Sequence, residues 1–264
     1  MKKKMMAGLL VGCMVMLSAC TSGTPKNTVH SLDDLEGKKI GVQLKTTGDV
    51  YSSDIKDAQV QRYNKGRDAV LALREGELDA VMLDDAPAKV FEEEFGDVKI
   101  RDEAYADEEY GIAVNKEKTE LLNKINDALA ELESEGTIDK IADDWFNGKV
   151  DKTAYDGQTK ESYAGGTLVM ATNAEFPPFE SRTGENEIIG LDVDIMKAVC
   201  DKLDMHLQVE HTAFDSIIAS VERGMADVGV AAMTITEERL KQVAFSNPYV
   251  TAKQVIIVRN DDKK

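Results

Sequence analysis

The sequence predicts an α/β protein built from two similar lobes. Short apolar stretches typical of strands alternate with amphipathic stretches typical of helices, which favours a mostly parallel sheet with helices on both faces. The pattern also repeats: DAVLALREGELDAVML (68–83) aligns with DSIIASVERGMADVGVA (215–231) if the second segment carries one extra residue. Both segments pass from a helix through a glycine and an aspartate to an apolar strand. Two lobes are therefore favoured over one long sheet.

Strands and helices alternate through the first half of the chain. Gly76 suits the end of one helix, because glycine readily adopts the left-handed conformation of a C-cap, and Pro87 suits the first turn of the next. The predicted strands are 38–44, 60–64 and 78–84, and the predicted helices are 52–58, 68–76 and 87–95.

The second half follows the same order, after two amphipathic helices and a linker. The two helices are 119–136 and 137–148, the second with Thr137 as its expected N-cap. Residues 150–166 have no periodicity and many small or polar side chains, which is typical of a linker. The strands predicted after it are 167–173, 206–212 and 226–232, and the helices are 191–203 and 214–224.

The N-terminal residues predict export rather than a part of the fold. Three lysines precede an uncharged apolar run at 5–17, which is shorter than the ~20 residues that a membrane-spanning helix needs. Residues 1–19 therefore predict a signal peptide. The sequence LSAC resembles the lipobox of bacterial lipoproteins, which makes Cys20 the expected lipidation site and 20–29 a lipid-anchored tether. The alternative is an ordinary secretion signal with an incidental cysteine.

Charge and cysteine content exclude several classes of protein. Removal of 1–19 takes three lysines and leaves 29 basic against 49 acidic residues, a formal charge of −20. Such a surface repels nucleic acid and anionic lipid. If Cys20 carries lipid, Cys200 has no partner for an intrachain disulfide, so a packed core must stabilise the fold.

Local motifs predict neither an enzyme nor a metal or cofactor site. The chain has no glycine-rich phosphate loop and no evident nucleophile with its base. His206 and His211 lie five residues apart on a predicted strand, so their side chains face opposite sides and cannot share a metal. Cys200 lies on an apolar helical face, which favours a buried structural thiol.

Several segments together resemble the bacterial extracellular solute-binding proteins of the polar-amino-acid family, family 3, which are capture subunits of ABC importers. The segments that resemble its first lobe are ATNAEFPPFE (171–180), IIGLDVDIMKAV (188–199), FDSIIASVERGMADVGVAAMTITEER (214–239) and FSNPYVTAKQVIIV (245–258). Those that resemble its second lobe are SLDDLEGKKIGVQLKTTGD (31–49) and ELDAVMLDDAPAKVF (77–91), and EEYGIAVNK (108–116) through DKIADDWF (139–146) resembles the return crossover and closing helices. The resemblance implies a type II periplasmic-binding-protein-like fold, with two α/β lobes joined by a hinge.

The order of these segments is reversed relative to the family, which suggests a circular permutation. The linker 150–166 would join the family's usual ends, and new ends would open between Asn260 and His30. We expect a small lobe at 30–107, a large lobe at 108–264, and a single crossover near 103–113 that loosens the hinge.

The resemblance also implies how a free amino acid would be held at both ends. Arg239 matches the family's carboxylate clamp, and Thr234 and the main chain at Ala232 match positions that hydrogen-bond the ligand backbone. Asp84 matches the ammonium acceptor, although its neighbour Asp85 has the same chemistry. Thr46 and Thr47 open a helix after a strand and could offer hydroxyl and N–H groups to the carboxylate.

The remaining candidates concern the ligand's side chain. Phe176 and Phe214 match aromatic positions that sandwich it, with core packing as the alternative. Asn173 stands where the family is often acidic and Lys45 where it often has glycine, and both departures weaken the case for a cationic ligand. Two more residues could line the pocket: Gln43 and Leu83.

These features predict a monomeric, lipid-anchored amino-acid-binding protein on the outer face of the cell membrane or in the periplasm. It would close on a polar or charged amino acid by hinge motion and deliver it to an ABC transporter permease. The alternatives are a cyclohexadienyl-type dehydratase on the same fold and a ligand-sensing lipoprotein.

Overall fold

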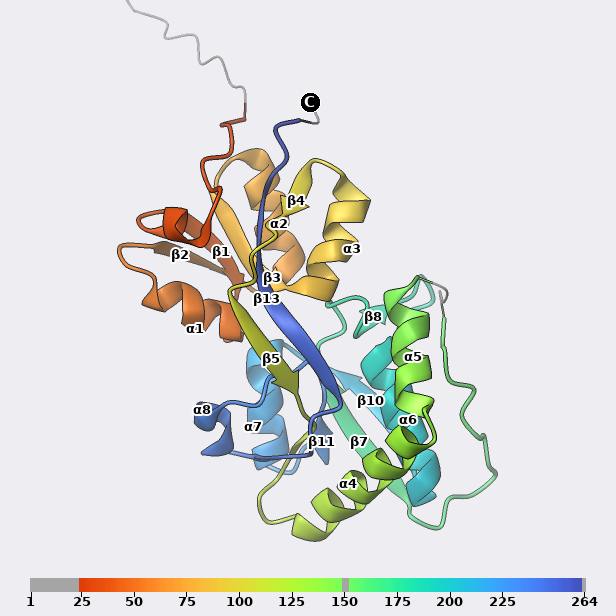
Figure 1. The fold of residues 1–264 in the computed structure, drawn as a ribbon. Coiled ribbons are helices and arrows are strands. Elements are labelled where there is room, and N and C mark those ends of the chain that lie inside the picture. The colour runs from red at the N-terminus through yellow and green to blue at the C-terminus, as the bar shows by residue number, and fades with distance from the viewer. Residues whose placement is uncertain (1–23, 149–151, 263–264) are drawn as a thin grey trace, which may run out of the picture.

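The structure is a computed structural model that describes residues 24–148 and 152–262. The predicted signal peptide, Cys20 and the first residues of the tether lie outside the described residues. Figure 1 shows two α/β lobes, one above the other, connected by long extended strands. The prediction of two α/β lobes is confirmed.

The small lobe, which comes first in the chain, contains a six-stranded sheet with the order β2-β1-β3-β13-β4 and β5 paired to β13. β1 runs parallel to β2 and β3, whereas β13 runs antiparallel to β3, β4 and β5. The strands are β1 (Lys39–Gln43), β2 (Gln59–Tyr63), β3 (Ala80–Asp84), β4 (Val98–Ile100), β5 (Ala106–Tyr110) and β13 (Val250–Arg259). The helices are the short 3₁₀ helix η1 (Leu32–Leu35), α1 (Thr47–Asp54), α2 (Gly66–Glu75) and α3 (Asp85–Phe95).

The large lobe contains a five-stranded sheet with the order β10-β7-β11-β6-β12, and a separate β8-β9 pair. The strands are β6 (Ala113–Val114), β7 (Thr167–Thr172), β8 (Ser181–Arg182), β9 (Ile188–Ile189), β10 (His206–His211), β11 (Val228–Gly229) and β12 (Ala244–Phe245). The helices are α4 (Thr119–Ser134), α5 (Thr137–Phe146), α6 (Leu191–Leu203), η2 (Phe214–Ser216), α7 (Ile217–Glu222) and α8 (Glu237–Leu240).

Two local boundaries differ from the prediction because of capping. Helix α1 begins at Thr47 rather than 52, since the Thr46 side chain accepts the N–H of Asp49 and caps an earlier turn. Helix α5 has Gly136 at its N-cap, in the left-handed conformation, so Thr137 is its first residue and not its cap.

The boundary predicted between the lobes needs a correction. Residues 250–259 do not stay in the large lobe, because β13 enters the first sheet and pairs with β3 from Gln254↔Asp84 to Ile257↔Val81. The physical reason is the run QVIIV, which is buried on both faces and belongs in the middle of a sheet. The small lobe is therefore completed by the last strand of the chain.

The number of connections between the lobes also differs from the expected single crossover. Within the described residues, the chain passes between the lobes twice: β5 leaves the small lobe, and β13 returns to it beside β5. The two strands pair antiparallel from Val250↔Tyr110 to Gln254↔Ala106. Figure 1 shows them side by side between the lobes. The expectation of a loosened hinge, which rested on one crossover, loses its basis.

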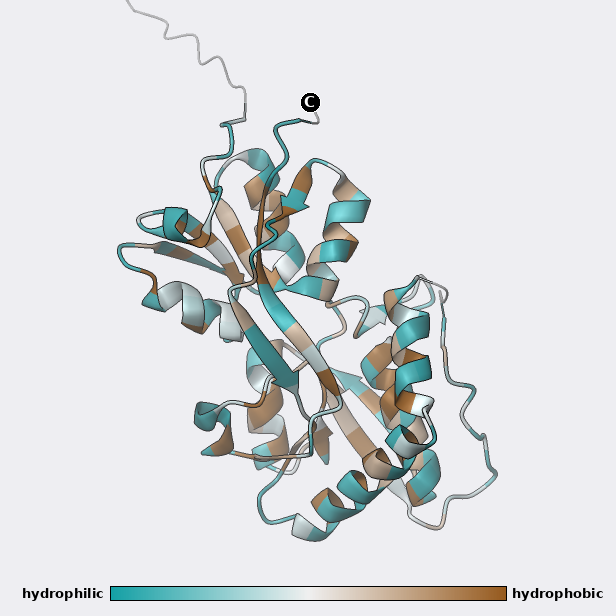
Figure 2. Ribbon diagram, in the orientation of Figure 1, coloured by the Kyte–Doolittle hydropathy of each residue, from teal (hydrophilic) through white to brown (hydrophobic). Residues whose placement is uncertain are grey.

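Apolar side chains form layers on both faces of each sheet. One cluster lies between the small-lobe sheet and the helices η1 and α1, and another lies between the large-lobe sheet and α7. The largest cluster passes from lobe to lobe and includes Tyr110 and Phe179. Figure 2 shows hydrophobic residues gathered on the central strands and on the helix faces turned toward them. Cys200 lies in this core with 2% of its surface exposed, as predicted for a structural thiol.

The described part of the linker, from residue 152 to 166, has no helix or strand and follows the outer side of α6 (Figure 1). Aspartates of α6 and its C-cap hold it in place. Asp201 Oδ2 accepts from the Tyr155 hydroxyl and from the Gln158 N–H, both at 2.9 Å. At the C-cap of α6, the carboxylate of Asp204 pairs with Lys160 at 2.7 Å.

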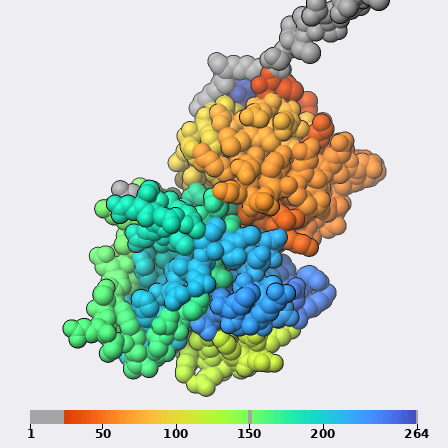
Figure 3. All heavy atoms as spheres, turned by 180° about the vertical axis from the view of Figure 1, so that it is seen from behind, coloured from red at the N-terminus to blue at the C-terminus, as the bar shows by residue number. Residues whose placement is uncertain are grey.

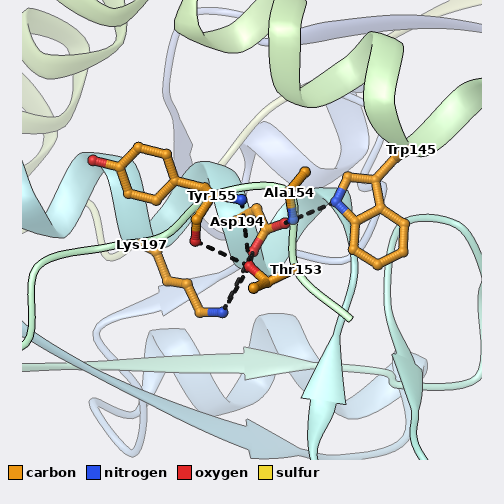
Figure 4. Close-up of polar contacts among 6 residues, drawn as sticks. All are labelled: Trp145, Thr153, Ala154, Tyr155, Asp194 and Lys197. Carbon is orange, nitrogen blue, oxygen red and sulfur yellow. Dashed lines mark hydrogen bonds and ion pairs between the residues drawn. The ribbon is translucent and has the colours of Figure 1, made fainter. Parts of the chain in front are cut away.

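The most buried of these contacts centres on Asp194, shown in Figure 4. Its carboxylate accepts from Trp145 Nε1 of α5 at 2.8 Å and from the Ala154 N–H of the linker at 2.6 Å. Thr153 Oγ1 donates to it at 2.5 Å, and Lys197 Nζ lies 3.4 Å away. One side chain thus joins α5, α6 and the linker.

We expect Asp194→Ala to lower the free energy of unfolding by about 3 kcal/mol, because it leaves the N–H groups of Trp145 and Ala154 without an acceptor. Urea unfolding at pH 7 measures the loss. Asp201→Ala is the matched control on the same helix: its carboxylate is only half-buried, so about 1 kcal/mol is expected. Equal losses in the two variants would contradict a special role for Asp194.

Candidate functional site

A small cavity of about 10 Å³, partly open to solvent, lies between the two lobes. Figure 3 shows the lobes in contact on the face opposite to that of Figure 1. The cavity lies beyond the carboxyl ends of the parallel strands β1, β3 and β7, where open α/β sheets place their ligands. Its lining residues are Gln43, Thr46, Thr47, Asp84, Asn173, Phe176, Glu180, Phe214, Ala231, Ala232, Thr234 and Arg239.

Ten of the residues singled out from the sequence line this cavity, and two do not. Leu83 lies in the core with 2% exposure, because side chains alternate along β3 and Asp84 takes the cavity side. The side chain of Lys45 is exposed, and the residue reaches the site through its main-chain carbonyl. Glu180 and Ala231 line the cavity but were not singled out.

Arg239 supplies a buried positive charge from the large lobe. It lies in the short helix α8, where the Thr236 side chain caps the helix by accepting the Arg239 N–H. Its Nη1 donates to the Thr234 carbonyl at 2.7 Å, and its Nη2 donates across the cleft to the Lys45 carbonyl at 3.2 Å. Only 8% of the residue is exposed, and burial lowers the pKa of its guanidinium. The guanidinium can bind a carboxylate through two parallel hydrogen bonds.

Asp84 supplies a buried acid from the small lobe, at the point where β3 ends. The Tyr110 hydroxyl donates to its Oδ2, and Gln254 Nε2 donates to its Oδ1 at 2.5 Å. Burial, and next the negative charge of Glu108, raise the pKa of Asp84 to about 7. Asp85 instead accepts the N–H of Ala86, so Asp84 is the one of the two that faces the cavity.

The N-terminus of α1 forms another wall of the cavity. Thr46 caps the helix and donates its hydroxyl to the Gln43 carbonyl at 2.8 Å. The preceding turn places Lys45 at φ +66°, in the left-handed region. Thr47, the first residue of the helix, is buried beside Gln254. The free N–H groups and dipole of such a terminus favour an anion.

Aromatic and amide side chains line the rest of the cavity. Phe176 is 6% exposed and stacks on Phe179 with ring centroids 6.2 Å apart. The half-buried Phe214 ring lies 5.4 Å from the Arg239 guanidinium. Gln43 Nε2 donates across the lobes to Asn173 Oδ1 at 3.1 Å.

Glu180 is the site residue that sequence reasoning missed most clearly. It is fully buried, and no N–H or O–H group of the described residues donates to either of its oxygens. Burial, and next the negative charge of Asp192, raise its pKa well above the ordinary value. The signal in the sequence was an acid closing the apolar run FPPFE.

Asp192 lies near Glu180 and binds the main chain of the site. Its carboxylate accepts from the Ala232 N–H at 2.7 Å and from the Tyr249 hydroxyl at 2.9 Å. Burial raises its pKa to about 6. Ala232 has φ +47°, so this contact holds a residue of the cavity wall in the left-handed region.

The cavity therefore presents a cationic end, an anionic group and an aromatic pocket. Among residues 24–148 and 152–262 no group of three or more His, Cys, Asp or Glu side chains could hold a metal ion. The same part of the chain contains no helix that is long and apolar enough to cross a membrane.

Comparison with known proteins gives one family match. The model of the bacterial extracellular solute-binding proteins, family 3, matches residues 26–148 and 168–264. Among curated relatives, the "ABC transporter arginine-binding protein 1" of Escherichia coli is 40% identical over 95 residues, which are 36% of this chain and 39% of the relative. The "Arginine-binding extracellular protein ArtP" of Bacillus subtilis is 38% identical over 94 residues, 36% of each chain.

A third relative, the "L-cystine-binding protein TcyJ" of Escherichia coli, is 31% identical over 129 residues, 48% of each chain. The chain thus spans less than half the length of these relatives, all of which are named as binding proteins and not as enzymes. Among solved structures, "An ancestral arginine-binding protein bound to arginine" is 44% identical over 32% of this chain and 37% of that one, with a TM-score of 0.32.

We expect the free energy of unfolding to fall as pH rises from 5 to 8. The raised pKa values of Asp84, Asp192 and Glu180 mean that the folded chain binds more protons than the unfolded chain over this range. Asp192→Asn should flatten the dependence, since a shift from 3.8 to about 6 corresponds to about 3 kcal/mol. Urea titrations at several pH values measure the slope.

Asp204→Asn serves as the control for this experiment. Its pKa is lowered, first by the hydrogen bond from Lys160, so it is ionised in both states throughout this range. The control should keep the wild-type slope, and an unchanged slope in Asp192→Asn would count against a buried carboxyl pair.

Proposed function

Because the chain belongs to the bacterial extracellular solute-binding proteins of family 3, we propose that it captures a free amino acid between its lobes and delivers it to an ABC importer permease. Its fold is of the type II periplasmic-binding-protein kind. The observation that carries the proposal is the pairing, in one cavity, of buried Arg239 from the large lobe with buried Asp84 from the small lobe. Arg239 and Asp84 come from opposite lobes, so a ligand bound to both would hold the lobes together.

The carboxylate of the amino acid would bind between Arg239 and the N-terminus of α1. A guanidinium binds a carboxylate through two parallel hydrogen bonds, which fixes its direction as well as its charge. Thr234, whose carbonyl holds Arg239 Nη1, and the main chain at Ala232 lie beside this position. Thr46 and Thr47 approach it from the opposite lobe.

The ammonium of the amino acid would bind Asp84. Burial makes the ionised form of Asp84 costly, and a cation placed next to it offsets that cost. The neighbouring Tyr110 hydroxyl and Gln254 amide keep its carboxylate oriented.

We propose a cationic amino acid, with arginine as the first candidate. Glu180 offers two buried oxygens without a donor beside Phe176, which suits a planar cation held on an aromatic face. Asn173 replaces an acid but still offers an amide oxygen, and Lys45 directs its charge to solvent. Arginine, histidine and cystine are the ligands named for the curated relatives.

We further propose that the chain is circularly permuted and anchored through lipid at Cys20, outside the cytoplasm. The family match falls in two blocks, 26–148 and 168–264, and the whole of the linker 150–166 lies between them. The two ends of the described chain lie together on the small lobe: Asn27 N–H donates to Asp261 at 3.1 Å, and Arg259 Nε donates to the Pro25 carbonyl at 2.8 Å. Exposed, neighbouring ends are what a permuted chain requires.

A thermal-shift screen of the purified chain against the twenty amino acids, ornithine and cystine tests the proposed function. At a ligand concentration of 100 Kd, binding adds about 2.7 kcal/mol to the stability and should raise Tm by roughly 5–10 °C. We expect the largest shift with arginine. No shift with any amino acid would overturn the function, and conversion of a cyclohexadienyl acid would support the dehydratase instead.

Arg239→Ala and Asp84→Ala should each weaken binding of the best ligand at least a hundredfold, because each leaves one buried charge of the ligand unpaired. Asp85→Asn is the matched control, since this neighbour does not line the cavity. Isothermal titration calorimetry measures the affinities. A hundredfold loss in the control, or none in Asp84→Ala, would reassign the ammonium acceptor.

Glu180→Gln tests the proposed specificity. The amide keeps the shape of the side chain but cannot become an anion, so affinity for arginine should fall about tenfold to a hundredfold. Affinity for glutamine, measured in the same titrations, should stay within a factor of about three. Equal losses for the two ligands would indicate that Glu180 only supports the fold.

A further inference from the structure

The two strands that join the lobes each carry one buried polar side chain to the back of the cavity. Glu108 on β5 is 4% exposed and Gln254 on β13 is fully buried. Glu108 pairs directly with Ala252, two residues before Gln254, so both side chains lie on the same face of the strand pair. Neither residue lines the cavity itself.

Gln254 connects two carboxylates. Its Nε2 lies 2.5 Å from Asp84 Oδ1 and 3.1 Å from Glu108 Oε2. A side-chain amide has two N–H donors, so one can point to each carboxylate. The two acids are thereby held close to one another by a neutral group.

Glu108 also reaches the large lobe. Its Oε2 accepts from the Thr234 hydroxyl at 3.0 Å, while the Thr234 carbonyl binds Arg239 Nη1. Its other oxygen, Oε1, is buried and receives no hydrogen bond from the described residues. One carboxylate on a connecting strand therefore contacts groups on both sides of the ligand cavity.

We propose that Glu108 is a positioning residue of the amino-acid site. It holds Asp84 indirectly, through Gln254, and it holds Thr234 directly. Its negative charge makes the site require a ligand ammonium. The inference rests on the proposed function. Two buried carboxylates close together repel each other, and a ligand ammonium beside Asp84 relieves that repulsion. A ligand without an amine leaves it in place.

Several charged and titratable groups act on Asp84 besides Glu108. The Tyr110 hydroxyl donates to Asp84 from β5, and the negative charge of Asp85, at the start of α3, raises the pKa of Asp84. The negative charge of Asp84 in turn acts to raise the pKa values of three groups across or beside the cleft: Tyr51, Glu180 and Arg239. After burial, the charge of Glu108 is the largest cause of the raised pKa of Asp84. Removal of this charge should lower that pKa.

The test compares Glu108→Gln with the wild-type chain by calorimetric titration of L-arginine at pH 8 and pH 5.5. At pH 8 Asp84 is ionised in both, and the variant, which lacks the second negative charge, should bind about tenfold more weakly. At pH 5.5 the wild-type Asp84 is mostly protonated, whereas the lower pKa in the variant keeps more of it ionised. The difference should therefore shrink to about threefold or less.

Two further measurements separate positioning from support of the fold. The deaminated analogue 5-guanidinopentanoate should bind the variant at least as well as the wild-type chain, because it brings no ammonium. Glu108→Asp retains the charge and should keep the wild-type pH dependence even if its affinity is lower. Should Glu108→Gln fail to fold, Gln254→Met removes the link instead and should weaken arginine more than the analogue.

An equal loss of arginine affinity at both pH values, or an equal loss for arginine and the analogue, would overturn the inference and leave the proposed function intact. Failure of the wild-type chain to bind any amino acid would overturn both.

Discussion

The antiparallel pairing of β5 with β13 is the interaction on which the rest of the structure depends. These strands make the only covalent passages between the lobes within residues 24–148 and 152–262, and they pass side by side. Because they are hydrogen-bonded to one another, the lobes can bend and twist about the pair but cannot separate freely. The same strands place Tyr110, Glu108 and Gln254 next to Asp84, so the hinge and the binding chemistry share residues.

The buried charged groups of the cleft depend on hydrogen-bond partners from both lobes and from the strands that join them. Arg239 donates to a carbonyl on each side of the cleft, and Asp84 is surrounded by groups from β5 and β13. Buried charges cost free energy unless they are paired or hydrogen-bonded. A zwitterion would complete the pairing of the two, which links the stability of the closed arrangement to the chemistry of the ligand.

Much of the site could be predicted from sequence because its residues match motifs of a known family, and some of them also follow the ends of strands or open helices. Asp84 closes β3, Thr46 caps α1, and Arg239 lies in the motif TITEER. Leu83 was misplaced because the alternation of side chains fixes only one of two neighbours on the cavity side. Glu180 was missed because its one signal, an acid that closes the apolar run FPPFE, does not say which side chains surround it in the folded chain. The entry of β13 into the small-lobe sheet depends on its pairing with β3, where the partner of Gln254 is Asp84, about 170 residues earlier, and periodicity does not reveal such a pairing.

The contact of residues 25–27 with residues 259–261 has a mechanical consequence. The N-terminal segment is attached to the small lobe, at the end remote from the cleft (Figure 1). If the N-terminal segment is held in place, the small lobe would be the stationary part, and the large lobe would be the one that moves in the proposed closure of the cleft. A force applied along the N-terminal segment would load the small-lobe sheet, and the binding cleft would stay outside the line of tension.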